Sequence, residues 1–443
     1  MWLSDIDRAK FEKWFTIFLI LLFTEGIFRK WVVSGSVSSI FMILRDPIVL
    51  LIVIKGHKMG LFNNKYARMI VVISCFTFAM TMLLGHQNIL VCLFAARITM
   101  IYIPAIYICG NVLTMSYIEN VGRFFLFLFV PVVILTVLQF VSPTNSWVNH
   151  GLGLEERYSG VAGDIMLRPS GIFMHISGLT DYYLLVFSFL FMFFVEKKLN
   201  SVYIRCLFIL YVISIPVSIS RTHFFMTFIA LIFYTICMTQ RKFANDLIKY
   251  VCLIVSFALI LSQFPFMSRF IDTFMARLVN ANASEGGAIN SMFNRTFGYV
   301  LNLLEKDVPL FGYGDGFFTN FGVQMIYGSV GVANISDSKL VAVLEAAEME
   351  WARLMMEDGI IVGGVLVLLR ILMAIQFFRM TKESLKNGNS VPLYFAPPAI
   401  IYMSNSQLKV PTHLGFLLVA CALFMASYNK NMYSWQKNAK KFC

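Results

Sequence analysis

Apolar residues occur along this chain in long blocks that are separated by short polar clusters. Each block is roughly 15 to 22 residues long, as in the run from Phe124 to Val141, and a helix of about 20 residues crosses the hydrocarbon core of a bilayer. Because a backbone in lipid must satisfy its own hydrogen bonds, these blocks predict membrane-spanning α-helices. The pattern excludes an outer-membrane barrel, whose short strands alternate apolar with polar residues.

Twelve spans are predicted in this way, which places both termini on one side of the membrane. The first apolar run is expected to be a retained span and not a cleaved signal peptide, because it leads into charged Glu25 and Arg29 without a small-residue cleavage site. We treat residues 1–443 as a single polytopic membrane domain. The predicted spans are 14–28, 39–54, 69–84, 89–109, 123–141, 179–195, 206–220, 223–239, 249–263, 358–378, 391–408 and 413–427.

Composition agrees with an all-α membrane protein, since 58% of the 443 residues are hydrophobic and 14% are charged. A net charge of +12 is compatible with nucleic-acid binding, but the lysines and arginines cluster in the short connections, as topology signals do. The basic charge is denser in the cytoplasmic segments when both termini are cytoplasmic, so the sequence favours that orientation and no nucleic-acid partner. The eight cysteines form no CxxC pair and none lies in a predicted external loop, which leaves disulfide and zinc sites without support.

Two external segments, 142–178 and 264–357, are too long to be simple connections. The larger one carries apolar residues at helical spacing in three places. These faces predict amphipathic helices that lie at the membrane surface or cover a cavity, with ordinary helix packing as the alternative. They consist of Phe266, Phe270, Phe274 and Leu278; of Phe293, Phe297, Val300, Leu301 and Leu304; and of Leu340, Leu344, Ala347, Trp351 and Leu354.

Several arginines lie on the predicted external side or at the ends of spans. Charges near the membrane are costly and often mark function. Arginine suits a pyrophosphate because its planar guanidinium donates hydrogen bonds in pairs and stays charged. The alternative for each is a headgroup anchor or a structural ion pair, as for Arg45 next to Asp46. The set comprises Arg29, Arg45, Arg168, Arg221, Arg295 and Arg353.

A glycine cluster, residues 311–317, lies in the larger loop. The amides around Gly312 and Gly314 are candidates for cradling an anion, because glycine permits close approach of the backbone. The alternative is a plain tight turn. The cluster is not a dinucleotide-binding motif, since no strand precedes it and the third glycine is misplaced.

No histidine lies within 264–357, so a catalytic base there is a carboxylate or comes from another loop. Glu350 is the preferred candidate because it lies beside Arg353 near the predicted entry of the tenth span. No acidic cluster with metal-ligand spacing stands out externally, so we expect neither a metal nor another cofactor. The other candidate bases, with ordinary surface charge as the alternative for each, are Asp315, Glu345 and Glu348.

Five groups of residues occur in the same order as in a known family of bacterial membrane enzymes. They are Glu25–Trp31 with Leu44–Pro47; Arg168–Phe173; Ser220–Thr222; Arg295 with Pro309–Gly314; and Glu350–Leu354 with Glu357–Ile360. In these residues the chain resembles the O-antigen polymerases of the Wzy type, within the superfamily that they share with the O-antigen ligases. The ligase branch carries a histidine near the end of the large loop, where this chain has Glu350, and this difference favours a polymerase.

The resemblance implies a glycosyltransferase of lipopolysaccharide O-antigen biosynthesis that works on the periplasmic side of the inner membrane. Its expected substrates are undecaprenyl-pyrophosphate-linked oligosaccharides, with the growing chain passing to the non-reducing end of a new lipid-linked repeat unit. A chain-length regulator protein is a candidate partner besides the lipid bilayer. An O-antigen ligase and a polysaccharide flippase or transporter remain alternative functions, although a transporter needs no large external loop.

The departing diphosphate in such a reaction requires cations. We expect Arg221 and Arg295 to be catalytic residues that stabilise the developing charge. Glu350 is the expected general base for the acceptor hydroxyl, a role that typically contributes about 10²–10⁴-fold to the rate. The expected substrate-binding residues are Arg45, Arg168, Arg353, Gly312 and Gly314.

Overall fold

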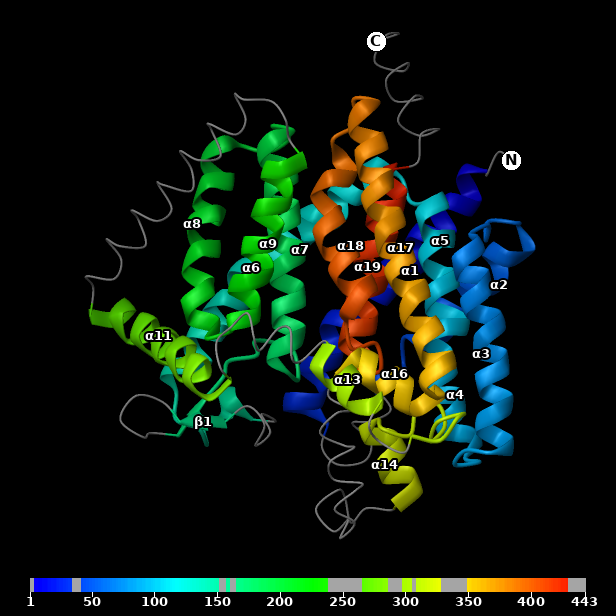
Figure 1. Cartoon of the computed structure of the whole chain (residues 1–443). Coiled ribbons are helices and arrows are strands. Elements are labelled where there is room, and N and C mark those ends of the chain that lie inside the picture. The colour runs from blue at the N-terminus through cyan, green and yellow to red at the C-terminus, as the bar shows by residue number, and fades with distance from the viewer. Residues whose placement is uncertain are drawn as a thin grey trace.

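The computed structural model describes residues 4–33, 41–150, 157–159, 165–237, 265–285, 297–304, 308–327 and 349–428, and these form a bundle of long helices (Figure 1). Within these ranges, seven helices are long and apolar enough to cross a membrane. The chain is therefore a helical membrane protein, as its apolar blocks predict. The seven are α3 (Lys65–Leu83), the continuous run of α4 (Ile89–Arg97), η3 (Ile98–Tyr102) and α5 (Ile103–Val112), α6 (Met115–Val141), α7 (Ile176–Val195), α8 (Ser201–Ser218), α17 (Ile360–Lys386) and α19 (Pro411–Tyr428).

Four further helices coincide with predicted spans but are shorter or carry more charge. Eleven of the twelve predicted spans overlap a described helix, and the twelfth, 249–263, lies outside the described residues. The four are α1 (Asp5–Ile27), which continues into the π-helical turn η1 (Phe28–Val32), α2 (Asp46–Lys58), α9 (Arg221–Cys237) and α18 (Val391–Asn405).

Polar residues in the short connections begin several of these helices. The Asn64 side chain accepts a hydrogen bond from the amide of Ala67 at the start of α3. Asn88 and Thr114 cap α4 and α6 in the same way. Such caps satisfy backbone donors that have no partner within the first turn. The polar clusters of the sequence thus set where the apolar helices begin.

The helix α19 lies in the middle of the bundle, beside α5, α7 and α18 (Figure 1). Most side chains of α7 and α19 are buried, and Phe416 of α19 packs against Phe23 and Phe173 from distant parts of the sequence. The helix therefore runs through the interior of the protein from Leu414 onward, while its first three residues are half-buried. This position decides which residues meet at the functional site.

Four helices of the larger loop lie together at one end of the bundle, here called the loop end, while α1 begins and α19 ends at the opposite end (Figure 1). Two of them occur where the sequence pattern predicts helices. Of the third predicted helix, only the part from Met349 onward lies within the described residues. The four are α11 (Pro265–Glu285), α13 (Tyr299–Leu304), α14 (Asn320–Tyr327) and α16 (Glu350–Asp358).

The apolar face of α11 packs on the bundle. Phe270 stacks on Phe140 of α6 with 4.1 Å between ring centroids, and Phe274 makes an edge contact with Phe224 of α9 at 6.1 Å. These contacts correspond to ordinary helix packing, the alternative to a helix that lies free on the membrane surface. They hold the start of the larger loop against α6 and α9.

The smaller of the two long loops, residues 142–178, contains a short β-hairpin. The prediction of an all-α protein does not include this hairpin. After the 3₁₀ turn η4 (Trp147–Asn149), strand β1 (Arg157–Ser159) pairs antiparallel with β2 (Ile165–Leu167). Each strand has three residues, too few to leave a period-two pattern in the sequence. The hairpin places Arg168 directly after β2.

Candidate functional site

The connection between α18 and α19, residues 406–410, lies at the centre of the contacts at the loop end. The Ser406 carbonyl accepts a hydrogen bond from Arg370 Nη2 at 2.9 Å, and the Leu408 amide donates to Glu350 Oε1 at 3.4 Å. Sequence reasoning assigned this segment no role, because it reads as a turn between two apolar spans. The contacts join it to α16 and α17.

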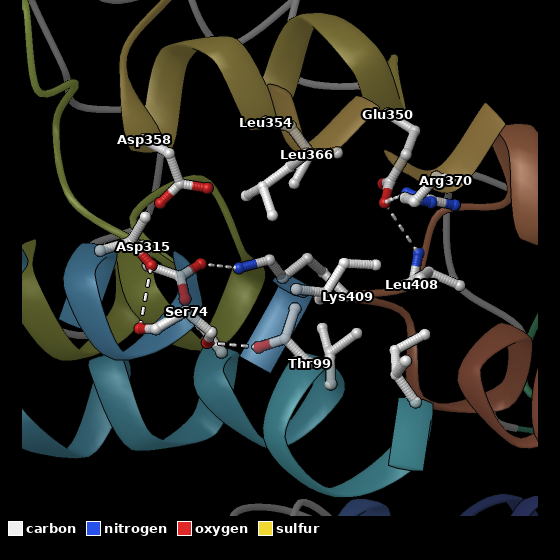
Figure 2. A pocket seen from close by; sticks show the side chains of 15 residues that line it. Ser74, Thr99, Asp315, Glu350, Leu354, Asp358, Leu366, Arg370, Leu408 and Lys409 are labelled. Carbon is white, nitrogen blue, oxygen red and sulfur yellow. Dashed lines mark hydrogen bonds and ion pairs between the residues drawn. The ribbon is translucent and has the colours of Figure 1, made fainter. Parts of the chain in front are cut away.

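Glu350 is buried, with 3% of its surface exposed, and Figure 2 shows its carboxylate beside Arg370. It forms ion pairs with Arg353 on its own helix and with Arg370 of α17, the latter at 2.5 Å. Burial alone raises the pKa of a carboxyl, but the two arginines hold the pKa of Glu350 below its ordinary value. A general base works best with a pKa near the operating pH. The geometry therefore favours a role in holding the arginines over the expected role of a free base.

A second group of buried charges surrounds Lys409. Its ammonium pairs with Asp315 from the glycine turn and with Glu357 Oε2 of α16 at 3.1 Å, and Asp358 follows in the chain. Burial lowers the pKa of an ammonium, yet the three carboxyls raise the pKa of Lys409 above its ordinary value. Burial, reinforced by Asp315, raises the pKa of Asp358 well above its ordinary value. One lysine thus pairs with two buried carboxyls, and a third, that of Asp358, follows in the chain.

A small cavity separates the two charge groups (Figure 2). Its volume is about 40 Å³. A space of this size holds a few waters but not a sugar. Its polar lining residues are Ser74, Thr77, Thr99, Asp315, Glu350, Asp358, Arg370 and Lys409.

The glycine turn does not cradle an anion. Gly312 and Gly314 have φ values of +70° and +103°, which suit glycine, but their amides donate to the carbonyls of Pro309 and Glu357. The Asp315 amide donates to Thr81 Oγ1 at 2.9 Å. The alternative of a tight turn describes this segment, and the occupied amides argue against the expected substrate-binding role of Gly312 and Gly314. The turn instead delivers the Asp315 side chain to Lys409.

Arg45 is a buried structural cation with 1% of its surface exposed. Its Nη2 pairs with Glu25 Oε2 at 2.8 Å and donates to the Pro411 carbonyl at 2.9 Å, while Arg29 pairs with the other oxygen of Glu25 at 3.0 Å. Its sequence neighbour Asp46 pairs instead with Arg97 at 2.6 Å. Arg45 therefore ties α1 to the start of α19, and this burial argues against the expected direct contact with substrate.

The remaining expected arginines lie in separate segments. Arg168 follows β2 and Arg221 begins α9, both at the loop end, and each is partly exposed. Ser220 hydrogen-bonds to Thr180 at 3.2 Å, which places the start of α9 against the start of α7. Arg295, the other expected catalytic arginine, lies outside the described residues.

An aspartate–histidine pair joins α7 to α19. His413 Nδ1 lies 2.5 Å from Asp181 Oδ2, and the Asp181 carbonyl accepts a hydrogen bond from Tyr402 at 2.9 Å. Sequence reasoning sought the base in the larger loop and gave these residues no role. An acidic residue inside the predicted span 179–195 was the available sign, since such residues are rare in lipid and usually have a partner.

All of these groups contact residues at the start of α19 or in the connection just before it. Leu408, Lys409, Pro411 and His413 contact Glu350, Asp315, Arg45 and Asp181, respectively. Comparison with models of known protein families and with curated proteins gives no match for this chain. The chain is a helical membrane protein whose function must be inferred from this site and from the sequence.

Proposed function

We propose that the chain is an O-antigen polymerase of the Wzy type, which joins undecaprenyl-pyrophosphate-linked oligosaccharide repeat units on the periplasmic side of the inner membrane. One observation carries the proposal. Segments of the family resemblance that are far apart in sequence contact one another at the loop end. Glu25 pairs with Arg45, and Lys30 donates to Ser170 Oγ at 2.6 Å and to the Gly171 carbonyl at 2.8 Å.

The charge at the loop end suits a substrate with a diphosphate. Arg353 and Arg370 share one carboxylate, that of Glu350, which leaves one positive charge in excess. Both arginines are buried, so this charge acts on a substrate through its field and not by direct contact. Fixed cations near a departing diphosphate lower the barrier because they need no reorganisation as charge develops. Arg221 and Arg168 add cations from α9 and from the hairpin loop.

The reaction needs two substrates held in one place. A growing chain on its lipid carrier is the donor, and the terminal hydroxyl of a new lipid-linked unit is the acceptor. Orientation of two bound reactants replaces a collision by an intramolecular step. The larger loop, packed on α6 and α9 through α11, supplies a surface over the bundle for this purpose.

Deletion of the gene tests the proposal against its alternatives. A strain that then carries single repeat units on its lipid core has lost a polymerase, and restored long chains on complementation support the proposal. Intact polymer left unattached to the lipid core indicates a ligase. Absence of any external repeat unit indicates a flippase. Either of the last two results overturns the proposal, and silver-stained lipopolysaccharide gels distinguish all three.

A further inference from the structure

A carboxylate–imidazole pair lies at the loop end, contributed by two transmembrane helices and not by the larger loop. Asp181 is buried in α7, and His413 lies in the first turn of α19. The two side chains meet at 2.5 Å between Oδ2 and Nδ1. The His413 side chain remains 14% exposed, and its Nε2 has no hydrogen-bond partner among the described residues. The ring therefore keeps one nitrogen for another molecule.

The pair lies between the cations that the proposed reaction requires. Thr180, next to Asp181, bonds to Ser220, and Arg221 follows in the chain. On the other side, Leu408, which lies in the connection just before α19, donates to Glu350, and Glu350 pairs with Arg353. The pair thus lies between two segments that carry arginines, the start of α9 and α16.

We propose that His413 is the general base of the transfer reaction and that Asp181 is its positioning residue, an inference that rests on the proposed function. His413 Nε2 takes the proton from the acceptor hydroxyl. The hydroxyl oxygen forms a bond to the anomeric carbon of the donor as the bond from that carbon to the phosphate oxygen breaks. The lipid pyrophosphate leaves with the electron pair of that bond.

The chemistry of the two groups explains the assignment. Imidazole is the side chain whose ordinary pKa lies nearest neutral pH, and it is the side chain that most often serves as a general base. A carboxylate on Nδ1 fixes the tautomer with the proton on that nitrogen, leaves Nε2 as the acceptor and stabilises the imidazolium that forms. Glu350 lacks this freedom because two arginines occupy its oxygens.

The test uses the full chain in proteoliposomes with lipid-pyrophosphate-linked repeat units, and it measures the rate of chain elongation. His413→Ala is expected to lower the rate about 10²–10⁴-fold. Added imidazole is expected to restore part of it, because a free base can occupy the vacated space. His413→Asn, which keeps a donor toward Asp181 but has no Nε2, is expected to remain folded and inactive. His57→Ala, an exposed histidine at the far end of α2, is the matched control.

The positioning role of Asp181 is tested with its own pair of variants. Asp181→Asn is expected to lose most of the rate, and Asp181→Glu is expected to recover part of it, since a carboxylate again orients the ring. Wild-type elongation by His413→Ala, or a folded His413→Ala protein that imidazole does not rescue, overturns the assignment of the base. Equal rates for Asp181→Asn and Asp181→Glu overturn the positioning role. If the wild-type protein itself elongates no chain under these conditions, the proposed function fails and not only this inference.

Discussion

Lys409 is a buried cation that lies among several carboxyl groups. It pairs with Asp315 and Glu357, and Asp358 lies close enough to add to their charge. Isolated ionised carboxylates are costly in a low-dielectric interior, so such a group lowers its cost by binding a proton. The pKa of Asp358 is raised well above its ordinary value, mainly by burial, so we expect this carboxyl to be the one that binds the proton.

The protonated state of Asp358 predicts the effect of an isosteric amide. Because folding raises the pKa of this carboxyl, its stability contribution is present at acidic pH and is lost as the pH rises toward the folded value. Asp358→Asn removes that penalty and is expected to raise the melting temperature at pH 8. The gain should shrink near pH 4. Thermal unfolding in detergent at both pH values measures it.

Lys409→Met is the opposing change, because it leaves the carboxyls without their shared cation. Breaking a buried ion pair by removing one partner costs about 3–5 kcal/mol. A lower melting temperature is expected for this variant at pH 8. If Asp358→Asn destabilises the protein at pH 8 as Lys409→Met does, Asp358 is ionised and the assignment of its proton is wrong.

Of the two arginines that we expect to be catalytic, Arg221 is the one that lies within the described residues. Arg221→Ala is expected to reduce polymer about 10²–10³-fold, the usual effect of removing one group that stabilises developing charge. Chain-length ladders from complemented deletion strains measure the loss, with immunoblots of membrane fractions to verify the protein level. Arg205→Ala is the control, since Arg205 is exposed near the start of α8 and hydrogen-bonds to Ser201. Normal ladders from Arg221→Ala contradict the role.

At the scale of elements, the glycine turn and α16 form one unit. The Tyr313 and Gly314 amides donate to the carbonyls of Met356 and Glu357, each at 2.9 Å. Gly359, which ends α16, has a φ of +83° and approaches Leu310 from the other side. This mutual approach holds Asp315 and Glu357 at the same lysine. The apolar periodicity of the loop gives no indication of it, because the contacts are made by backbone atoms.

Gly312→Ala tests this unit. A β-carbon at this position lies 2.3 Å from the Glu357 carbonyl oxygen, and its left-handed backbone costs a non-glycine residue about 1–2 kcal/mol. The variant is expected to have a lower melting temperature and reduced elongation. Gly364→Ala, near the start of α17 with its nearest atom at 3.7 Å, is expected to leave both unchanged. Equal effects of the two substitutions would contradict a close docking of the turn on α16.

At the scale of the whole molecule, the bundle has two distinct ends. The helices of the larger loop gather at one of them, and α1 begins at the other (Figure 1). The distribution of lysines and arginines predicts that the end with the termini faces the cytoplasm. The proposed reaction requires this orientation, since its lipid-linked substrates are presented on the periplasmic side.

Labelling of single cysteines tests the orientation. In a variant whose eight native cysteines are replaced, Leu310→Cys lies at the loop end and Val202→Cys at the opposite end, at positions where the native side chains are 63% and 60% exposed. A membrane-impermeant maleimide is expected to label Leu310→Cys in spheroplasts. It should label Val202→Cys only after the membrane is permeabilised. The reverse pattern inverts the predicted topology and removes the periplasmic site.

The helical membrane architecture can be predicted from the sequence alone. Apolar blocks of the length of a bilayer predict where most of the helices lie, because each helix satisfies its backbone locally and reveals itself by composition. The helical face of Phe270 and Phe274 likewise predicts α11. Such features depend on residues that are near one another in the chain, so the pattern of apolar and polar residues predicts them.

Which charged residues pair with one another depends on the packing of the helices and cannot be predicted from the sequence. His413 and Asp181 are 232 residues apart, and Lys409 and Asp315 are 94 apart. Their pairing follows from the position of α19 in the middle of the bundle, beside α7, which no local pattern encodes. The same packing gave Glu350 two arginine partners and occupied the amides of the glycine turn. Residue types near the loop end were thus visible in the sequence, whereas their partners, and hence their chemistry, depended on how the helices pack.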